Sequence, residues 1–190
     1  PEKSQPNLIT HVQVEAAHES DANALLPAIA EAAKRELAPI ELLADSLYGS
    51  DDNLEKAKEL GVEVVSPAMG SAPEGISLAD FTFSETDEMI ACPQGQPPQR
   101  IKTGKNGGKI VHFDKATCDH CPWQSDCPVK RIKKSATLSY DAKSLRLARR
   151  RAKEKTAAFR EVYRFRAGAE ATMSDLDRVT GIKHLRVRGM

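Results

Sequence analysis

The chain has 190 residues, of which 40% are hydrophobic and 29% are charged, a composition typical of globular proteins and not of disordered or fibrous ones. No apolar run approaches the roughly 20 residues that a membrane-spanning helix needs, which excludes that class. Residues 1–6 are polar and include no initiator Met, so we expect a piece of a longer protein without a secretion signal.

The net charge of +1 conceals a very uneven distribution of charge along the chain. Residues 1–95 contain 5 Lys and Arg against 18 Asp and Glu, whereas residues 96–190 contain 23 against 9. A basic half of this size favours a polyanionic partner, most simply nucleic acid. The alternative is that each half is solvated on its own and the two halves attract one another.

The first third of the chain has the pattern of an α/β unit. Alternating apolar residues predict a strand over 8–14, and short apolar runs predict two more at 40–44 and 62–65. Helical spacing predicts a helix over 20–36, and Ser50 is the predicted N-cap of a second helix. Strands that alternate with helices at these lengths predict parallel strand pairing.

The pattern then breaks. Residues 67–135 are rich in Pro, Gly, Lys and Cys and have no sustained periodicity. A stretch of this length without regular structure is uncommon in a compact domain unless something orders it, so we interpret it as an irregular insertion. Residues 141–181 have apolar positions at helical spacing, which predicts one long helix with a break near Gly168.

Two parts of the chain carry candidate functional side chains. Asp45 follows a predicted strand, and ligands of open α/β sheets bind at the carboxyl ends of strands. Taken alone, a turn or a helix cap is the simpler role for Asp45. Tyr163, Arg166 and Glu170 lie on one face of the long predicted helix. Arg166 and Glu170 form either a surface ion pair or a pair that keeps the carboxylate ionised for a divalent cation.

Three stretches resemble one known family. Residues 44–49 are similar to the strand end that carries the family's second catalytic Asp, and Tyr163-x2-Arg166-x3-Glu170 matches the signature around its catalytic Glu. The ending, 164–189, is typical of members that carry a cysteine-rich insertion. Over essentially all of its length, the sequence resembles the C-terminal part of a DDE-type insertion-sequence transposase with an RNase H-like catalytic domain.

The resemblance implies an α/β fold with an RNase H-like core that is incomplete at the N-terminus (1–66), a cysteine-containing insertion (67–140) and a C-terminal helical part (141–190). The first predicted strand corresponds to the family's third. The family's first catalytic Asp is therefore missing, and we expect this piece alone to be inactive. A Lys of the family's signature is replaced by Asp177, beside Arg178. The implied location is the bacterial cytoplasm, at the nucleoid.

The implied reaction is phosphoryl transfer that cuts and rejoins DNA at insertion-sequence ends, with two metal ions. The resemblance assigns catalysis and the binding of Mg²⁺, or Mn²⁺, to Asp45 and Glu170. DNA is the implied partner, with self-association as a further option. The side chains that would position phosphates are Tyr163, Arg166 and Arg178.

Four cysteines have the spacing C-x25-C-x2-C-x5-C. Because no secretion signal is expected, a structural zinc site with four thiolate ligands is favoured over disulfides. The alternative is a loop with reduced thiols and no metal, and His112 and His120 are substitute ligands. The four candidate ligands are Cys92, Cys118, Cys121 and Cys127.

The basic half contains the candidate DNA-binding side chains. The runs 130–134 and 149–155 are the most basic. Successive helical residues diverge by about 100°, so at least one of Arg149, Arg150 and Arg151 is expected to pack or pair inside the protein. The candidate DNA contacts are Lys130, Arg131, Lys133, Lys134, Arg149, Arg150, Arg151, Lys153 and Lys155.

Two other functions stay open at this point. The first is a non-enzymatic nucleic-acid-binding module built on a zinc knuckle, which predicts that Asp45 and Glu170 lie far apart. The second is another nuclease with an RNase H-like fold, such as a resolvase.

Overall fold

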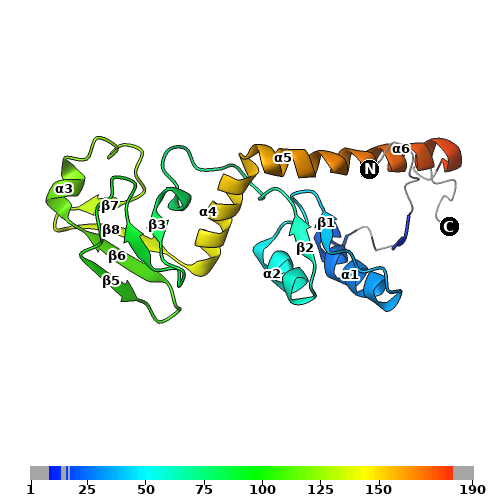
Figure 1. Cartoon of the computed structure of the whole chain (residues 1–190), viewed down its shortest axis with the longest axis horizontal. Helices are drawn as coiled ribbons and strands as arrows, with labels where there is room; N and C mark the ends of the chain where they lie inside the picture. The colour runs from blue at the N-terminus through cyan, green and yellow to red at the C-terminus, as the bar shows by residue number, and fades with distance from the viewer. Residues whose placement is uncertain (1–8, 14–15, 17, 182–190) are drawn as a thin grey trace. The chain divides into compact units, whose positions relative to one another are not determined.

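The computed structural model describes residues 9–13, 16 and 18–181, and the chain divides into two compact units (Figure 1). Unit 1 consists of Pro1–Met69 together with Lys155–Met190, and unit 2 is Gly70–Glu154. Both units contain helices and strands, which confirms a mixed α/β protein. None of the helices within the described ranges is long and apolar enough to cross a membrane.

Unit 1 is built on two short parallel strands, as predicted. β1 (Glu41–Leu43) pairs with β2 (Glu63–Val65), with Leu42 opposite Val64. The helix between them is α2 (Asp51–Glu59), and Ser50 is its N-cap, because its Oγ accepts the N–H of Asn53 at 3.2 Å. The unit begins with a 3₁₀ helix, η1 (Asp21–Ala24), that leads into α1 (Leu25–Lys34).

The core of unit 1 lies between α1, α2 and the strand pair. Leu25 and Ile29 are four positions apart on α1, so they share one face, and both are buried. They pack with Ala57 of α2, which is fully buried, and with Val62 and Val64. Because all of these residues are apolar, their burial is the main force that holds the unit together.

The strand predicted over 8–14 is not found: residues 9–13, its described part, have no regular structure. Ile9 and Val12 are 47% and 72% exposed. An alternating sequence forms a strand only where a neighbouring strand pairs with it and a core covers its apolar face. Among the described residues, β1 and β2 pair only with each other.

The long helix predicted over 141–181 is interrupted early. Its first part, α4 (Ala142–Glu154), belongs to unit 2. A new start follows at Thr156, whose Oγ1 accepts the N–H of Phe159. A second interruption, a 3₁₀ turn over Arg164–Arg166, lies close to the break predicted near Gly168, and Gly168 itself lies in the helix that follows. Gly181 ends that helix in the left-handed conformation (φ 64°), as helix C-termini favour. The segments in unit 1 are α5 (Ala157–Tyr163), the 3₁₀ helix η3 (Arg164–Arg166) and α6 (Ala167–Thr180).

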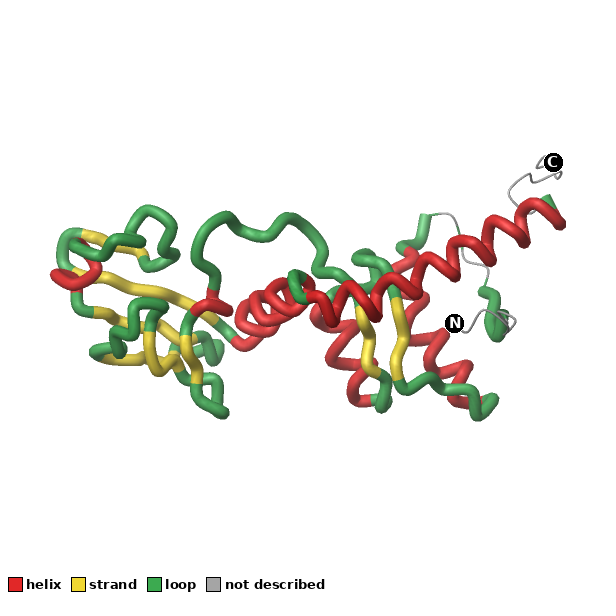
Figure 2. Tube along the Cα trace, turned by 45° about the horizontal axis from the view of Figure 1, so that its top comes forward, coloured by secondary structure: helices red, strands yellow, loops and turns green. Residues whose placement is uncertain are grey.

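In unit 1, the rod formed by α5, η3 and α6 passes across one end of the β1–β2 pair (Figures 1 and 2). This is the end at which β1 stops and Asp45 follows. The rod therefore brings the C-terminal segment to the carboxyl edge of the strands.

Unit 2 is a folded β structure, so the prediction of an irregular insertion is wrong. Its sheet has the antiparallel order β5-β6-β8-β7, beside a separate β3–β4 hairpin. The strands have two to six residues each, too few for an alternating pattern to stand out in the sequence. The bounds are η2 (Leu78–Asp80), β3 (Thr82–Phe83), β4 (Met89–Ala91), β5 (Arg100–Thr103), β6 (Lys109–Phe113), α3 (Lys115–Asp119), β7 (Lys130–Ile132) and β8 (Ser135–Tyr140).

Unit 2 has its own core on one face of this sheet. Val111 and Ala136 are fully buried there, with Leu145 of α4 packed against them. Tyr140 ties the hairpin to the sheet, because its hydroxyl donates to the carbonyl of Asp87 at 2.9 Å and accepts the N–H of Met89 at 3.2 Å. The segment therefore has enough buried apolar surface for an ordered structure.

Candidate functional site

Asp45 begins a tight turn after β1. Its Oδ1 accepts the N–H of Leu47 at 2.9 Å, and its backbone carbonyl accepts a hydrogen bond from the Ser66 hydroxyl at 2.7 Å. Ser66 is only 1% exposed and follows β2 directly. Gly49 lies so close to it that a Cβ there would collide with the Ser66 hydroxyl and lie 2.8 Å from the Pro67 carbonyl. The turn is therefore packed closely on the end of β2, which fixes the position of Asp45.

Arg166 joins the two predicted carboxylates. Its Nη1 lies 2.5 Å from Oε1 of Glu170, and its Nη2 lies 3.4 Å from Oδ2 of Asp45. The side chains of Arg166, Asp45 and Glu170 are 28%, 40% and 66% exposed. The structure thus brings Asp45 and Glu170 to one guanidinium at the edge of unit 1.

The electrostatics of Arg166 follow from these contacts. The hydrogen bond to Glu170 is the main reason that the pKa of Arg166 lies above its ordinary value, and the charge of Asp45 adds to this increase. Partial burial acts in the opposite direction. The guanidinium is consequently a permanent positive charge between two carboxylates.

The other predicted phosphate-binding residues lie at different distances from this group. Tyr163 is one turn before Arg166, and its ring stacks on Phe159 with centroids 5.4 Å apart. Arg178 forms an exposed ion pair with Asp175 at 3.1 Å. Arg178 is eight residues after Glu170, about 12 Å along a helix axis, so the structure does not place it at the carboxylates.

The carboxylate oxygens of Asp45 and Glu170 are of the type that a hard divalent cation binds, but two carboxylates are too few for a complete metal site. Carboxylate oxygens are the ligands that Mg²⁺ and Mn²⁺ prefer. In the described part of the chain, no group of three or more His, Cys, Asp or Glu side chains is arranged to hold a metal ion. Asp45 and Glu170 supply two carboxylates, and Arg166 offsets one of their two negative charges.

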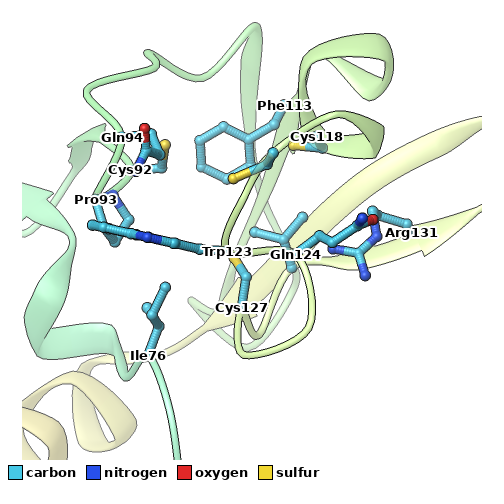
Figure 3. Close-up of a pocket in the computed structure, with 12 residues that line it drawn as sticks. Ile76, Cys92, Pro93, Gln94, Phe113, Cys118, Trp123, Gln124, Cys127 and Arg131 are labelled. Carbon is cyan, nitrogen blue, oxygen red and sulfur yellow. The ribbon is translucent and has the colours of Figure 1, made fainter.

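The four cysteines surround one cavity in unit 2. All are free thiols, and Cys92, Cys118, Cys121 and Cys127 line a small cavity of about 30 Å³ (Figure 3). Phe113 and Trp123 line it as well. Turn hydrogen bonds hold the backbone on two sides, from Gly95 N to the Cys92 carbonyl and from Cys121 N to the Cys118 carbonyl. Four cysteines that are separated by 25, 2 and 5 intervening residues in the sequence therefore line the same cavity.

The thiols influence one another electrostatically. Burial is the main cause that raises the pKa of Cys118 and of Cys127, and the charges of the neighbouring thiols raise both further. Arg131, which also lines the cavity, opposes the increase. Thiols that repel one another as thiolates are a donor set that a cation such as Zn²⁺ would stabilise.

The candidate histidine ligands differ in position. His120 directly precedes Cys121 and its Nδ1 is 2.8 Å from the Ala116 carbonyl. His112 pairs with Thr137 and therefore lies on the sheet face opposite to that of Phe113. Cysteine is thus the residue type that gathers at the cavity.

The predicted basic residues fall into separate groups. Lys130 and Arg131 are adjacent in β7, so they point to opposite faces of the sheet, and Lys133 and Lys134 are exposed in the β7–β8 turn. Arg149 forms an ion pair with Asp87 at 2.8 Å and lies over the Phe83 ring at 5.6 Å. Arg149 nevertheless stays exposed. Of the three consecutive arginines, Arg150 packs inside the protein as expected, with a side chain only 15% exposed and its Nε 3.9 Å from Oε1 of Glu154.

One residue at the carboxylate site had no role in the sequence prediction. Ser66 holds the Asp45 backbone from the end of β2. Because β1 and β2 are parallel, the residues that follow them meet at the same edge, and this rule could have identified Ser66.

The comparisons with known proteins found one match. A profile of the family described as transposase DDE domain matches residues 91–190. The matched region contains all four cysteines and Glu170, and it starts after Asp45. No curated protein and no solved structure matched the chain. Since the match covers more than half of its residues, the chain belongs to the transposase DDE domain family.

Proposed function

We propose that the chain is the C-terminal part of a transposase catalytic core, in which Asp45 and Glu170 are two of the carboxylates that hold the divalent ions. The observation that carries this proposal is that both carboxylates contact Arg166, although they come from opposite ends of unit 1 in sequence. In a DDE transposase, such carboxylates serve the cutting and rejoining of DNA at insertion-sequence ends. RNase H-like topology belongs to the same proposal, supported by the parallel β1–β2 pair and the helices around it.

The residues present have distinct tasks in this proposal. Mg²⁺ or Mn²⁺, when bound by Asp45 and Glu170, would polarise the phosphate that is attacked. The turn at Leu47 and the Ser66 hydroxyl keep Asp45 in place. Arg166 has a planar fork that suits a phosphate as well as it suits a carboxylate, so it is the candidate to bind a DNA phosphate beside the two acids.

We further expect the 190-residue piece alone to cleave no DNA. Two carboxylates leave a two-metal centre without its third protein ligand. The described residues supply no group of three. The proposal therefore predicts weak metal binding at Asp45 and Glu170 without strand cleavage.

Titration of Mn²⁺, followed by its electron paramagnetic resonance signal, tests this site on the chain itself. We expect Asp45→Asn and Glu170→Gln each to weaken Mn²⁺ binding at least tenfold. Glu161→Gln is the matched control, because Glu161 forms an exposed ion pair with Arg164 in the same rod. Binding that is equal in all four proteins would reject the carboxylate site, and nicking of plasmid DNA that Glu170→Gln abolishes would reject the expected inactivity.

The alternatives from the sequence are less well supported. A purely nucleic-acid-binding module predicts that Asp45 and Glu170 lie far apart, whereas they contact one guanidinium. Another nuclease, such as a resolvase, is disfavoured because the family match is to transposases.

A structural zinc ion is the second part of the proposal. Four free thiols that line one cavity support a site with four cysteine ligands, and binding of zinc would release their protons. Zinc binding would require the side chains to rotate, because within the described residues the thiols are not arranged as a metal-binding group. Such an ion would link the turn after β4 to α3 and to the segment before β7.

Elemental analysis of chain purified without added metal tests the zinc proposal. We expect about one zinc per chain, and Cys118→Ser or Cys127→Ser to lose it. Four freely titratable thiols and no zinc after incubation with ZnCl₂ would reject the proposal.

A further inference from the structure

The sheet of unit 2 has one face that faces the core and one that is open. Directly paired residues lie on the same face, so the register defines both sets. Ile101, Val111 and Leu138 form one row on the core face. On the other face, the register places two rows across the strands: Arg100, His112, Thr137 and Lys130 in one, and Lys102, Ile110 and Ser139 in the other.

This open face carries three cations, and Asp141 lies beside its second row, in the same pocket as Ile110 and Ser139. Arg100, Lys102 and Lys130 are all exposed, and Ile110 is 39% exposed, so no other part of the described structure covers them. None of the residues in the two rows is Asp or Glu. Thr137 and Ser139 add hydroxyl groups that donate hydrogen bonds.

The cations of this face differ from those cations of unit 2 that form ion pairs within the unit. Lys109, Lys115 and Arg149 form ion pairs with Glu88, Asp119 and Asp87. No such pair with a described residue is found for Arg100, Lys102 or Lys130, which are thus available for an external anion. Unit 2 as a whole has 15 Lys and Arg against 10 Asp and Glu, so part of its excess charge is concentrated on this face.

We propose that the open face of the β5-β6-β8-β7 sheet binds the phosphate backbone of duplex DNA. This inference rests on the proposed function for the identity of the partner, and it adds a contact surface in unit 2 that is separate from the carboxylate site. Arg100 and Lys130 stand on the two edge strands, three strand spacings or about 14 Å apart. That span is comparable with a major groove about 12 Å wide, so the two cations match phosphates on both sides of it.

The face is suited to phosphates and not to bases. It has no Phe, Tyr or Trp in either row, so it lacks a platform on which unpaired bases could stack. Lys, Arg, Thr and Ser side chains contact phosphates irrespective of sequence. The surface therefore fixes the protein on the duplex and leaves the choice of sequence to other parts of the transposase.

The test is a salt titration of the binding of the full 190-residue chain to fluorescent duplexes of unrelated sequence. No Mg²⁺ or Mn²⁺ is added, so that metal at Asp45 and Glu170 does not contribute and the proposed zinc of unit 2 stays in place. The variant is the triple change Arg100→Gln, Lys102→Gln and Lys130→Gln. The control of equal charge is Lys34→Gln, Lys56→Gln and Lys58→Gln, on exposed positions of α1 and α2.

The triple variant should reduce the slope of log K against log salt by about 2.7 units, or 0.9 for each lost phosphate contact. As a consequence, the affinity ratio between parent and variant should shrink about 40-fold between roughly 50 and 200 mM salt. The neighbours Lys130 and Arg131 give a finer comparison. Lys130→Gln should reduce the slope by about one unit, whereas Arg131→Gln should leave it unchanged, because Arg131 lies on the other face.

Three results would overturn the inference. Equal losses in the triple variant and its control would mean that only net charge matters. An unchanged slope in the triple variant, with DNA bound by the parent, would reject this face and leave the carboxylate site untouched. No binding of DNA by the parent would reject both this face and DNA as a partner of the isolated chain, whereas the Mn²⁺ titration tests the carboxylates separately.

Discussion

Nη2 of Arg166 lies 3.4 Å from Oδ2 of Asp45, although the two residues are 121 positions apart in the sequence. The same guanidinium holds Glu170 through Nη1. The guanidinium of Arg166 therefore lies between the two carboxylates, at the place where the proposed function requires a divalent cation. A metal ion and Arg166 should consequently compete for these oxygens, which has a measurable consequence.

Arg166→Gln should make the chain respond more strongly to Mg²⁺. Without the guanidinium, Asp45 and Glu170 repel each other, and a bound cation relieves this repulsion in the folded state only. The substitution alone should cost less than about 1 kcal/mol, because the ion pairs are partly exposed. Thermal unfolding with and without about 10 mM Mg²⁺ measures both effects. An equal rise in Tm for parent and variant, with Arg164→Gln as the control, would contradict the competition.

Gly49→Ala should destabilise unit 1 by about 1 to 3 kcal/mol, as overpacking at a close contact does. The new methyl group would collide with the Ser66 hydroxyl and lie 2.8 Å from the Pro67 carbonyl. Ser66→Ala in the same chain should restore part of the loss, since only the first clash is removed. Urea unfolding gives the free energies, and Gly104→Ala is the control because the nearest atom to its Cβ is 3.5 Å away. Equal stability of Gly49→Ala and Gly104→Ala would mean that the turn is looser than the structure indicates.

Local signals in the sequence were sufficient for much of unit 1. Ser50 was predicted as a cap because a cap depends on its own helix, and the structure has its hydrogen bond to Asn53. The parallel pairing of β1 and β2 followed from the short helical connection between them. The contact of Arg166 with Asp45 could be inferred only through the family resemblance, because nothing local relates a turn to a helix 121 positions later.

The β-sheet of unit 2 could not be predicted from the sequence, for a different reason. On β6, Ile110 and Val111 are adjacent and lie on opposite faces, so the apolar pattern does not alternate. Pairing with β5 and β8, and not the local pattern, defines this strand. The convergence of the cysteines depends on the same pairing, whereas their spacing alone already suggested a common site.

Asp114 is the N-cap of α3, the helix that carries Cys118 of the cysteine cavity, and its ionisation should affect the stability of the protein at acidic pH. Hydrogen bonds from the backbone N–H and the hydroxyl of Thr117 lower the pKa of Asp114, the N-cap of α3. A carboxylate with a lowered folded pKa contributes stability above its unfolded pKa of about 3.9, and this contribution disappears as the pH falls through the folded pKa. Asp114→Asn should retain the cap but lose this pH dependence, whereas Asp114→Ala should lose both.

Melting temperatures between roughly pH 3 and 6 compare the parent with these two Asp114 variants. Because α3 carries Cys118, Asp114→Ala should also weaken zinc binding if the proposed zinc site exists. A parallel decline of the parent and Asp114→Asn towards acid would show that another carboxylate is responsible.

The thiols of unit 2 should make the metal-free chain less stable as the pH rises, whereas the zinc-bound chain should become more stable. Because burial and neighbouring thiols raise the pKa of Cys118 and of Cys127, the folded metal-free chain keeps protons that the unfolded chain has lost. Its free energy of unfolding should therefore fall as the pH rises through about 8.5, the ordinary pKa of cysteine, towards the folded values. Zinc needs thiolates, so in its presence stability should instead increase from about pH 6 to 8 as protons are released.

Urea unfolding across this range, with EDTA or with one equivalent of ZnCl₂, measures both curves. Cys118→Ser combined with Cys127→Ser should flatten them, because the two thiols with raised pKa values are then absent. Superimposable curves with EDTA and with zinc would remove the physical basis for a metal in this cavity and leave four half-buried thiols that pack beside the core.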